Sequence, residues 1–492
     1  MADEHAFLQP GRTCWRVETA SRAALLIENG AYFAAAKAAM QKAQRSIWLL
    51  GWTFDPRTRL EPTATPGPDE QVGSFLKRLA KQRPDLDIHI LAWQSQLAIS
   101  ASQGGYPQRA APEFVGSRIK FRLDATTPFG ACHHQKVLVI DDSLAFCGGG
   151  DLTVDRWDTP DHIDGDDRRR LPSGRVYPPR HEVMMMVEGA PATALAQLAR
   201  ERWRRATRQP APSVAPLEPA PWPDHVEPEF HDVPVGIART EPAWRGATGA
   251  DEIEALHMRC ILNAKRSIYL ENQYVTSGVL ADALCRRLKE PDGPEVVVVS
   301  TLRSPSWFDQ NTMDRARNQF VHRLQESDVH DRFRAYTPVT RDRACIIVHS
   351  KVAIIDGRLL RAGSANLNNR SGGFDTECDL AIEAAEDDIQ TQAAIRAFRS
   401  RLIGHYLLCG QEAFDEALTR TGSLARAVEA LDDPERRRLK PIVPRGKSPL
   451  SRFVTRWGIG DPAGTHDSWR PWLRKSTLRE ERARLRWVAS DD

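Results

Sequence analysis

HHQKVLVIDDSLAFCGGGD spans residues 133–151 and returns in altered form as HSKVAIIDGRLLRAGSAN at 349–366. In both copies one residue separates a histidine from a lysine, four separate that lysine from an aspartate, and six separate the aspartate from a glycine. The paired positions are His134 and His349, Lys136 and Lys351, Asp141 and Asp356, Gly148 and Gly363, Gly149 and Ser364, and Asp151 and Asn366. Because every interval agrees, we expect two copies of one structural unit and of one polar site.

The repeat extends beyond this motif. The segment AQRSIWLLGW at 43–52 is echoed by AKRSIYLENQ at 264–273, and each opens an apolar strand after a helix-like segment. Further strand candidates lie at 87–93 and 295–301. Alternating helical and extended apolar runs favour an α/β fold with a largely parallel or mixed sheet. The chain is therefore predicted to be a duplication of a unit of roughly 170–200 residues.

Shifts in composition divide the chain into four parts. Residues 208–230 read RQPAPSVAPLEPAPWPDHVEPEF, which is too rich in proline for a helix or a central strand, so 208–233 is predicted to be a linker. It would separate a first repeat, 1–207, from a second repeat, 234–408. Residues 409–492 form a C-terminal extension that is basic and contains tryptophan. We favour a solvated extension packed on the second repeat over a surface for anionic lipid headgroups.

The bulk composition is that of an ordinary globular protein. Hydrophobic residues make up 41% and charged residues 27% of the chain, so a sizeable core is expected. The net charge of +3 is mild for a protein that binds duplex nucleic acid, and no nucleic-acid partner is expected. The eight cysteines are scattered without a Cys-x-x-Cys pair, which indicates reduced thiols and not a disulfide framework or a zinc site.

The sequence shows no signal peptide and no apolar run of about 18 residues that would span a bilayer. The expected location is therefore the cytoplasm or, through peripheral binding, a membrane surface. Export by a dedicated secretion system is the open alternative. The oligomeric state is not determined by the sequence, and a monomer is compatible with it.

The strand pattern of each motif places its histidine and lysine on one face. Side chains two positions apart point to the same side of a strand, so His134 lies beside Lys136 and His349 beside Lys351. If the halves pack with pseudo-twofold symmetry, two imidazoles and two ammonium groups converge on one anion. A phosphodiester fits this set, because lysine stabilises charge on the phosphoryl oxygens while one histidine attacks and the other donates a proton. The scheme needs no metal or other cofactor, and none is predicted.

Carboxylates downstream of the motifs are candidates for orienting the rings. Asp158 in DRWDT and Glu377 in FDTECD could each bind the second nitrogen of a catalytic imidazole and help to separate the two pKa values. His133 projects from the opposite strand face and is expected to be structural. His181 and Glu182 are candidates for the mouth of the site, although a loop histidine is more often merely exposed.

The paired motifs resemble those of the phospholipase D superfamily, specifically its duplicated, single-chain members. The resemblance covers residues 30–405, and the segment from His133 to RWDT is especially similar to the first motif of phosphatidylcholine-type phospholipases D. Other similar segments are IYLENQY (268–274), GSANLNNRS (363–371) and the run from PRHEV to RW (179–204). The resemblance implies an α-β-α sandwich in each repeat and an active site at the pseudo-twofold interface.

The resemblance also implies roles for individual residues. The matching catalytic set is His134, Lys136, Asp141, His349, Lys351 and Asp356. In the family scheme His134 forms a phosphohistidine intermediate, and His349 is the general acid and later the base. Lys136, Lys351 and Asn366 would bind phosphate, whereas the two aspartates of the set are expected to order strand ends.

Asp151 departs from the asparagine that many members carry, so it is not assigned as a phosphate donor. The phosphatidylcholine-type subgroup shares this aspartate. The implied reaction is hydrolysis of a glycerophospholipid to phosphatidate and its head alcohol, with transphosphatidylation when another alcohol intercepts the intermediate. The alternatives are a cardiolipin-synthase-like phosphatidyltransferase, a nuclease, which the mild charge disfavours, and a non-catalytic lipid-binding scaffold. The loop at 159–180 carries no readable signal of headgroup preference.

Overall fold

The computed structural model describes residues 6–63, 70–95, 105–436, 438–444, 449, 453 and 457–464. The chain divides into two compact units. The first-motif unit comprises Val17–Val235, and the second-motif unit comprises Met1–Arg16 together with Gly236–Asp492.

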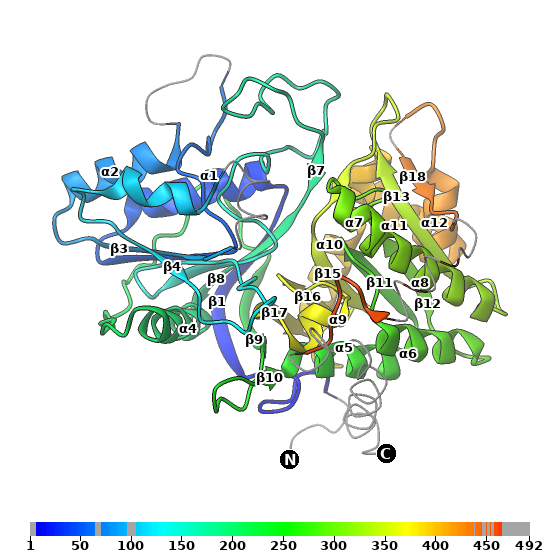
Figure 1. The fold of residues 1–492 in the computed structure, drawn as a ribbon. Helices are drawn as coiled ribbons and strands as arrows, with labels where there is room; N and C mark the ends of the chain where they lie inside the picture. The colour runs from blue at the N-terminus through cyan, green and yellow to red at the C-terminus, as the bar shows by residue number, and fades with distance from the viewer. Residues whose placement is uncertain are drawn as a thin grey trace. The chain divides into compact units, whose positions relative to one another are not determined.

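The first-motif unit is built on a mixed sheet with the strand order β1-β8-β6-β5-β2-β3-β4. Figure 1 labels β1, β8, β3 and β4 of this sheet. The strands are β1 (Arg16–Ile27), β2 (Ser46–Gly51), β3 (Asp87–Trp93), β4 (Lys120–Asp124), β5 (Val137–Ile140), β6 (Leu144–Gly148) and β8 (Val183–Gly189), and a two-residue strand, β7 (Arg180–His181), precedes β8. The strands β2, β3 and β4 run parallel, whereas β5, β6, β8 and β1 alternate in direction.

Helices cover both faces of this sheet, which explains the nearly continuous apolar runs of β2 and β3. The helices are α1 (Asn29–Lys42), α2 (Val72–Gln82), the 3₁₀ helix η1 (Gln108–Phe114) and α4 (Ala190–Thr207). Ile47 and Leu49 of β2 share one core with α1 and α2. The intervening Trp48 points to the other face, where its ring meets Trp203 of α4 edge-on at a centroid distance of 5.8 Å.

The second-motif unit repeats this plan with the order β18-β13-β12-β11-β15-β16-β17. Its strands are β9 (Phe230–Glu241), which begins in the other unit, β10 (Ala250–Asp251), β11 (Ser267–Asn272), β12 (Glu295–Val299), β13 (Phe333–Val339), β14 (Ile347–Val348), β15 (Lys351–Ile355), β16 (Leu359–Gly363), β17 (Glu377–Glu383) and β18 (Arg438–Pro441). Its helices are α5 (Glu252–Asn263), α6 (Gly278–Lys289), α7 (Trp307–Asn311), α8 (Met313–Ser327), α9 (Asn369–Gly373), α10 (Ile389–Leu407), α11 (Gln411–Thr421) and α12 (Leu424–Leu431).

The strands of the two units correspond one to one. β2, β3, β4, β5, β6 and β8 match β11, β12, β13, β15, β16 and β17 in order and in relative direction. Residues of α5, α6 and α8 pack on one face of the second sheet, against Leu270 and Ala353. On the other face, Tyr406 of α10 donates a hydrogen bond to Glu271 of β11 at 3.2 Å. The predicted duplication and the predicted α-β-α sandwiches are thereby confirmed.

The first residues of the chain belong to the second-motif unit, although the sequence placed residues 1–207 in the first repeat. The reason is a specific contact: the backbone N–H groups of Phe7 and Leu8 both donate at 2.8 Å to the carboxylate of Glu383 at the end of β17. A charged acceptor that binds two backbone donors fixes this segment firmly.

The proline-rich segment differs from a free linker because it packs on the first-motif unit. Trp222 is buried, and its carbonyl accepts a hydrogen bond from Lys42 Nζ at 2.8 Å. Glu229 accepts from the backbone N–H of Leu25 in β1 at 2.7 Å. Proline suits such a wrapped segment, since it adds rigidity where no ladder hydrogen bonds are needed.

The described part of the C-terminal extension adds α11, α12 and an edge strand to the second-motif unit. The strand β18 pairs antiparallel with β13, and Leu439 lies opposite Pro338. The basic, tryptophan-containing segment at 468–487 lies outside the described residues. Within the part of the chain that the structure describes, no helix is both long enough and apolar enough to cross a bilayer.

Candidate active site

Strand pairing brings the two ends of the first motif to one edge of the sheet. Val137 at the start of β5 pairs with Leu50 near the end of β2, and Gly148 at the end of β6 pairs with Met184 near the start of β8. His134, which lies just before β5, therefore shares an edge with the glycines that follow β6. We call this edge the motif edge of the unit.

The second-motif unit has the same arrangement. Lys351 at the start of β15 pairs with Asn272 at the end of β11, and Gly363 at the end of β16 pairs with Asp379 near the start of β17. The motif edge of this unit therefore carries His349 and the segment that leads to Asn366.

In the first motif, successive side chains point to opposite faces, which separates the catalytic candidates from their structural neighbours. Lys136 is buried, and its Nζ donates to the carbonyl oxygen of the half-buried His134 at 2.7 Å. The intervening Gln135 points the other way and accepts from Arg202 of α4 at 3.2 Å. This is the period of two that an extended segment imposes.

His133 has the structural position that its place in the motif predicts. Its Nε2 lies 3.0 Å from Asp124 Oδ2, and Arg202 binds the same oxygen at 3.0 Å. Burial, reinforced by the positive charge of Arg202, lowers the pKa of His133 to about 4 despite the nearby carboxylate. His133 is therefore neutral at physiological pH and anchors α4 to the sheet.

The second motif repeats this pattern with different partners. The Nζ of Lys351 donates to the carbonyl of His349, and both side chains are buried. Lys351 Nζ also lies 3.5 Å from the amide oxygen of Gln273. Ser350, between them, points to the opposite face and donates to Glu271 at 2.8 Å.

The aspartate of each motif binds backbone groups at the far end of its strand. Asp141 accepts from the N–H groups of Gln44, Arg45 and Ser46 at 2.7–2.8 Å, just before β2. Asp356 accepts in the same way from Lys265, Arg266 and Ser267, just before β11. Both aspartates have positive φ, near 51° and 56°, in the turn that reverses the chain. A carboxylate with three backbone donors tightly fastens two strand ends, and it lies at the edge opposite the histidine.

The residues that follow the glycines differ between the units. Asp151 lies 3.4 Å from Lys136 Nζ through Oδ2, and its Oδ1 accepts from the N–H of Trp52 at 2.9 Å. Asn366 replaces this charge with a carboxamide, whose buried Oδ1 has no hydrogen-bond partner among the described residues. Leaving a buried amide oxygen unpaired costs free energy.

Glu377 and Glu182 occupy the same position in the two sheets. Gly148 pairs with Met184 as Gly363 pairs with Asp379, so counting back two residues along β8 and β17 reaches Glu182 and Glu377. Both carboxylate side chains are fully buried at the motif edge. Asp158 was the expected counterpart of Glu377, but the strand register assigns that position to Glu182.

Each of these glutamates contacts the turn at the end of the strand that pairs with its own: Glu377 the turn after β16, and Glu182 the turn after β6. Glu377 accepts from the hydroxyls of Ser364 and Ser371, both at 2.6 Å. Ser371 in turn accepts from the backbone N–H of Asn366 at 3.0 Å. In the other unit a Cβ added to Gly149, the counterpart of Ser364, would lie only 2.4 Å from Glu182 Oε1. Glycine is required there because the carboxylate fills the space of a side chain.

Asp158 organises the loop that follows the first motif and does not contact His134. Its four partners, each at 2.9 Å, are the N–H groups of Thr159 and Arg180, His162 Nδ1 and Arg169 Nη1. A carboxylate bound to an arginine and an imidazole in a buried site is already compensated. The prediction that Asp158 orients a catalytic ring is therefore replaced by a structural role in the loop.

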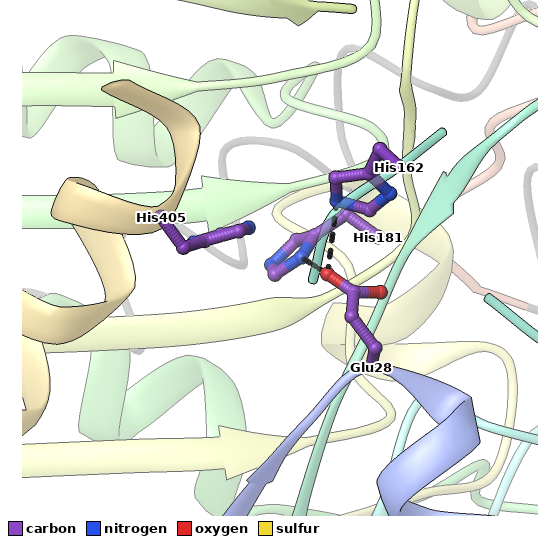
Figure 2. Close-up of side chains that lie close together, drawn as sticks. All are labelled: Glu28, His162, His181 and His405. Carbon is purple, nitrogen blue, oxygen red and sulfur yellow. Dashed lines mark hydrogen bonds and ion pairs between the residues drawn. The ribbon is translucent and has the colours of Figure 1, made fainter. Parts of the chain in front are cut away.

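Glu28 joins this loop to Glu182 and was not identified from the sequence. Figure 2 shows its carboxylate with the rings of His162 and His181 beside it: His181 Nδ1 donates to Oε1, and His162 Nε2 lies 3.2 Å from the same oxygen. Glu28 also exchanges backbone and side-chain hydrogen bonds with Glu182, at 2.8 and 3.1 Å. Its φ of 71° is a strained value that these contacts hold in place.

The charges in this cluster stabilise one another. Burial alone would raise the pKa of Glu28, but the positive charge of His181 and His162 outweighs it and holds the pKa well below its usual range. Burial would likewise lower the pKa of His162, but Glu28 and Asp158 outweigh it and raise that pKa. Glu28, His162 and His181 also have donor atoms close enough together to hold a metal ion. His181 and Glu182 were expected to line the mouth of the site, but both are fully buried.

Comparison with protein families agrees with this architecture. A family model described as "Cardiolipin synthase, PLD-like domain" matches residues 258–400, which include the second motif. Among solved structures, the phosphatidylserine synthase of Haemophilus influenzae Rd KW20 is similar with a TM-score of 0.54 and 11% identity, over 79% of this chain and 88% of that chain. This second likeness shows a shared fold.

Curated relatives match over most of the chain. Phospholipase D A of Dictyostelium discoideum is 26% identical over 461 residues, which cover 78% of this chain and 35% of that protein. Phospholipase D1 of Saccharomyces cerevisiae is 24% identical over 463 residues, covering 76% and 27%. Phospholipase D2 of Bos taurus is 23% identical over 466 residues, covering 73% and 49%. The chain thus spans less than half the length of these relatives.

The two sheets of matching strand order, each with a histidine–lysine motif at one edge, define a duplicated α/β protein. These matches make the chain similar to members of the phospholipase D superfamily.

Proposed function

We propose that this protein is a phospholipase D-type phosphodiesterase that hydrolyses glycerophospholipids to phosphatidate and a head alcohol. The observation that supports this most is that both units present the same histidine–lysine pair at the same edge of the same sheet. Lys136 and Lys351 are almost fully buried. A lysine ammonium group fixed at the motif edge can stabilise the negative charge of a phosphoryl group.

The proposed reaction has two steps and requires both histidines to act on one phosphate. In the first step a ring nitrogen of His134 attacks phosphorus, the bond from phosphorus to the head alcohol breaks, and His349 gives its proton to the leaving oxygen. In the second step water attacks phosphorus, His349 takes the proton of that water, and the phosphorus–nitrogen bond breaks. Lys136, Lys351 and Asn366 are proposed to bind the phosphoryl oxygens.

Glu182 and Glu377 are proposed to orient the two rings. A carboxylate that accepts from the second nitrogen of an imidazole fixes the tautomer and stabilises the protonated ring. Both glutamates are buried at the motif edges. Glu377 accepts from the hydroxyl of Ser364, and Glu182 accepts from the backbone N–H of Val183. We further propose that the substrate is met at a membrane surface, because its two acyl chains keep it in lipid aggregates.

The test is a lipid panel. Purified protein is incubated with labelled phosphatidylcholine, phosphatidylethanolamine and phosphatidylglycerol, with and without ethanol, and the products are separated. Phosphatidate without ethanol and phosphatidylethanol with it are the expected products. His134→Ala and His349→Ala should each lower the rate by several orders of magnitude. Turnover confined to DNA or RNA, or full activity in either variant, would contradict the proposal.

A phosphatidyltransferase is the second candidate, because the matching family model carries the description cardiolipin synthase. Both reactions share the covalent intermediate and differ in the acceptor. Vesicles that contain only phosphatidylglycerol decide between them: a transferase yields cardiolipin and glycerol, whereas a hydrolase yields phosphatidate and glycerol.

A further inference from the structure

Exposed aromatic side chains lie close to the motifs in both units. Among the described residues, the phenylalanine and tryptophan side chains that face solvent are Phe129, Trp307, Phe308 and Phe453. Trp307 is 76% exposed, Phe129 63% and Phe308 53%. Single exposed apolar side chains are common, but neighbouring ones such as Trp307 and Phe308 indicate an interaction surface.

Strand topology places Trp307 and Phe308 at the motif edge of the second-motif unit. They open α7, which follows the end of β12, and β12 runs parallel to β11. The end of β11 is where Lys351 pairs with Asn272. A direct contact joins the two regions, since Thr301 Oγ1 donates at 2.8 Å to the carbonyl of Val348, the residue before His349.

Phe129 has the corresponding place in the first-motif unit. It lies between the end of β4 at Asp124 and the start of β5 at Val137, in the segment that leads into His134. β4 runs parallel to β3, and β3 to β2, so this segment also lies at the motif edge. Three of the four exposed aromatic side chains are thus at the edges that carry the histidines.

Positive charge flanks the aromatic pair. Arg303 donates to the side-chain amide of Gln310 at 3.2 Å, and Arg315 donates to that of Asn311 at 3.3 Å. Neither arginine is engaged by a carboxylate in the described part of the chain, and one carboxylate, Asp309, lies on α7 between them. Tryptophan beside arginine side chains that bind no carboxylate is typical of a segment that enters the interface of an anionic membrane.

We propose that Trp307 and Phe308, aided by Phe129, enter the headgroup layer of a phospholipid membrane and hold each motif edge against it, with Arg303 and Arg315 favouring anionic lipid. This inference rests on the proposed function, because a lipid hydrolase must draw its substrate from such a surface. The proposed partner is the lipid aggregate itself, whichever headgroup the enzyme cleaves.

Binding is tested apart from catalysis in a His349→Ala background, where lipid is not consumed. Trp307→Ala/Phe308→Ala is compared with Val329→Ala/Ile389→Ala, a matched pair that is 65% and 72% exposed and lies away from the motif edge. Cosedimentation with vesicles of phosphatidylcholine and phosphatidylglycerol should weaken at least about tenfold for the aromatic pair, because its apolar area no longer leaves water. The matched pair should bind as the parent does.

Arg303→Gln/Arg315→Gln should lose the preference for vesicles that contain phosphatidylglycerol over phosphatidylcholine alone. The active forms are then assayed on vesicles and on a short-chain phosphatidylcholine dissolved as monomers. Trp307→Ala/Phe308→Ala should lower turnover about tenfold or more on vesicles and leave turnover of monomers unchanged. Equal losses on both substrates, or vesicle binding that does not change, would overturn the inference. An enzyme that binds vesicles through these aromatics yet cleaves no lipid would refute the proposed function alone.

Discussion

Lys136 Nζ lies 3.4 Å from Asp151 Oδ2, whereas its counterpart Lys351 lies 3.5 Å from the neutral amide of Gln273. The equivalent positions after the glycines also differ in charge, because Asp151 is a carboxylate and Asn366 a carboxamide. The cation of the first motif is compensated by a buried carboxylate, and the cation of the second motif lies on the same edge as the uncharged Asn366.

Replacing Asp151 with asparagine tests this asymmetry. Asp151→Asn keeps an Oδ1 acceptor for the N–H of Trp52 but removes the charge beside Lys136. Inorganic phosphate should then inhibit roughly tenfold more tightly, because an uncompensated cation in a low-dielectric site attracts the anion more strongly. Asp155→Asn, which changes a nearby carboxylate paired with arginine, is the control and should have little effect. Weaker phosphate inhibition in Asp151→Asn would show that the carboxylate does not offset the lysine.

Glu182→Gln and Glu377→Gln test the equivalence that the strand register reveals. If each glutamate orients a catalytic ring, both variants should lose about 10²- to 10⁴-fold in kcat with little change in KM. Asp158→Asn is the matched change in the neighbouring loop. It should lower the melting temperature, because Arg169 and His162 lose a charged partner, while the folded enzyme keeps kcat within about tenfold of the parent. A larger kcat loss in Asp158→Asn than in Glu182→Gln would restore the assignment made from sequence.

Asp141 and Asp356 are predicted to support the fold and not the chemistry. Each accepts three backbone hydrogen bonds in front of a central strand, at the edge away from the histidines. Asp141→Ala and Asp356→Ala should therefore each lower the free energy of unfolding by about 2–4 kcal/mol. Denaturant titration measures this change, and kcat of the remaining folded enzyme should stay within a few-fold. Loss of kcat without loss of stability would place either aspartate in the reaction.

The sequence predicted the features that depend on local spacing. The period of two in the motifs identified which neighbours share a face, and His133 and Gln135 do point away from His134 and Lys136. The repeated intervals identified the duplication, because each interval is the length of one strand and its turn. The strand-end role of Asp141 also follows from position, since the residue lies one step beyond β5.

Features that depend on the register of distant strands could not be predicted. Glu182 lies opposite the glycine turn only because β8 pairs with β6 after a long intervening loop. A signal was present: Glu182 and Glu188 bracket an apolar run as Glu377 and Glu383 do, each followed by a long helix. The sequence favoured Asp158 because this residue is nearer to the motif. That the loop binds the Asp158 carboxylate could not be predicted without knowing where the loop folds back.

The stability of the first-motif unit should fall in mild acid because two buried histidines resist protonation. Burial is the main cause that lowers the pKa of both His89 and His133 to about 4. Above about pH 6.5 both are neutral whether the chain is folded or not, so they add no pH dependence. Between about pH 6.5 and pH 4 the unfolded chain binds protons that the folded chain does not, and each histidine lowers stability by up to about 1.4 kcal/mol per pH unit.

His89→Phe retains stacking on Trp48, whose ring lies 3.8 Å away, and removes one proton from this balance. The acid-side slope of unfolding free energy against pH should therefore become shallower by about that amount, while the exposed His330→Phe control leaves it unchanged. An equal slope in His89→Phe and the parent would mean that His89 takes up its proton in the folded protein as readily as in the unfolded chain.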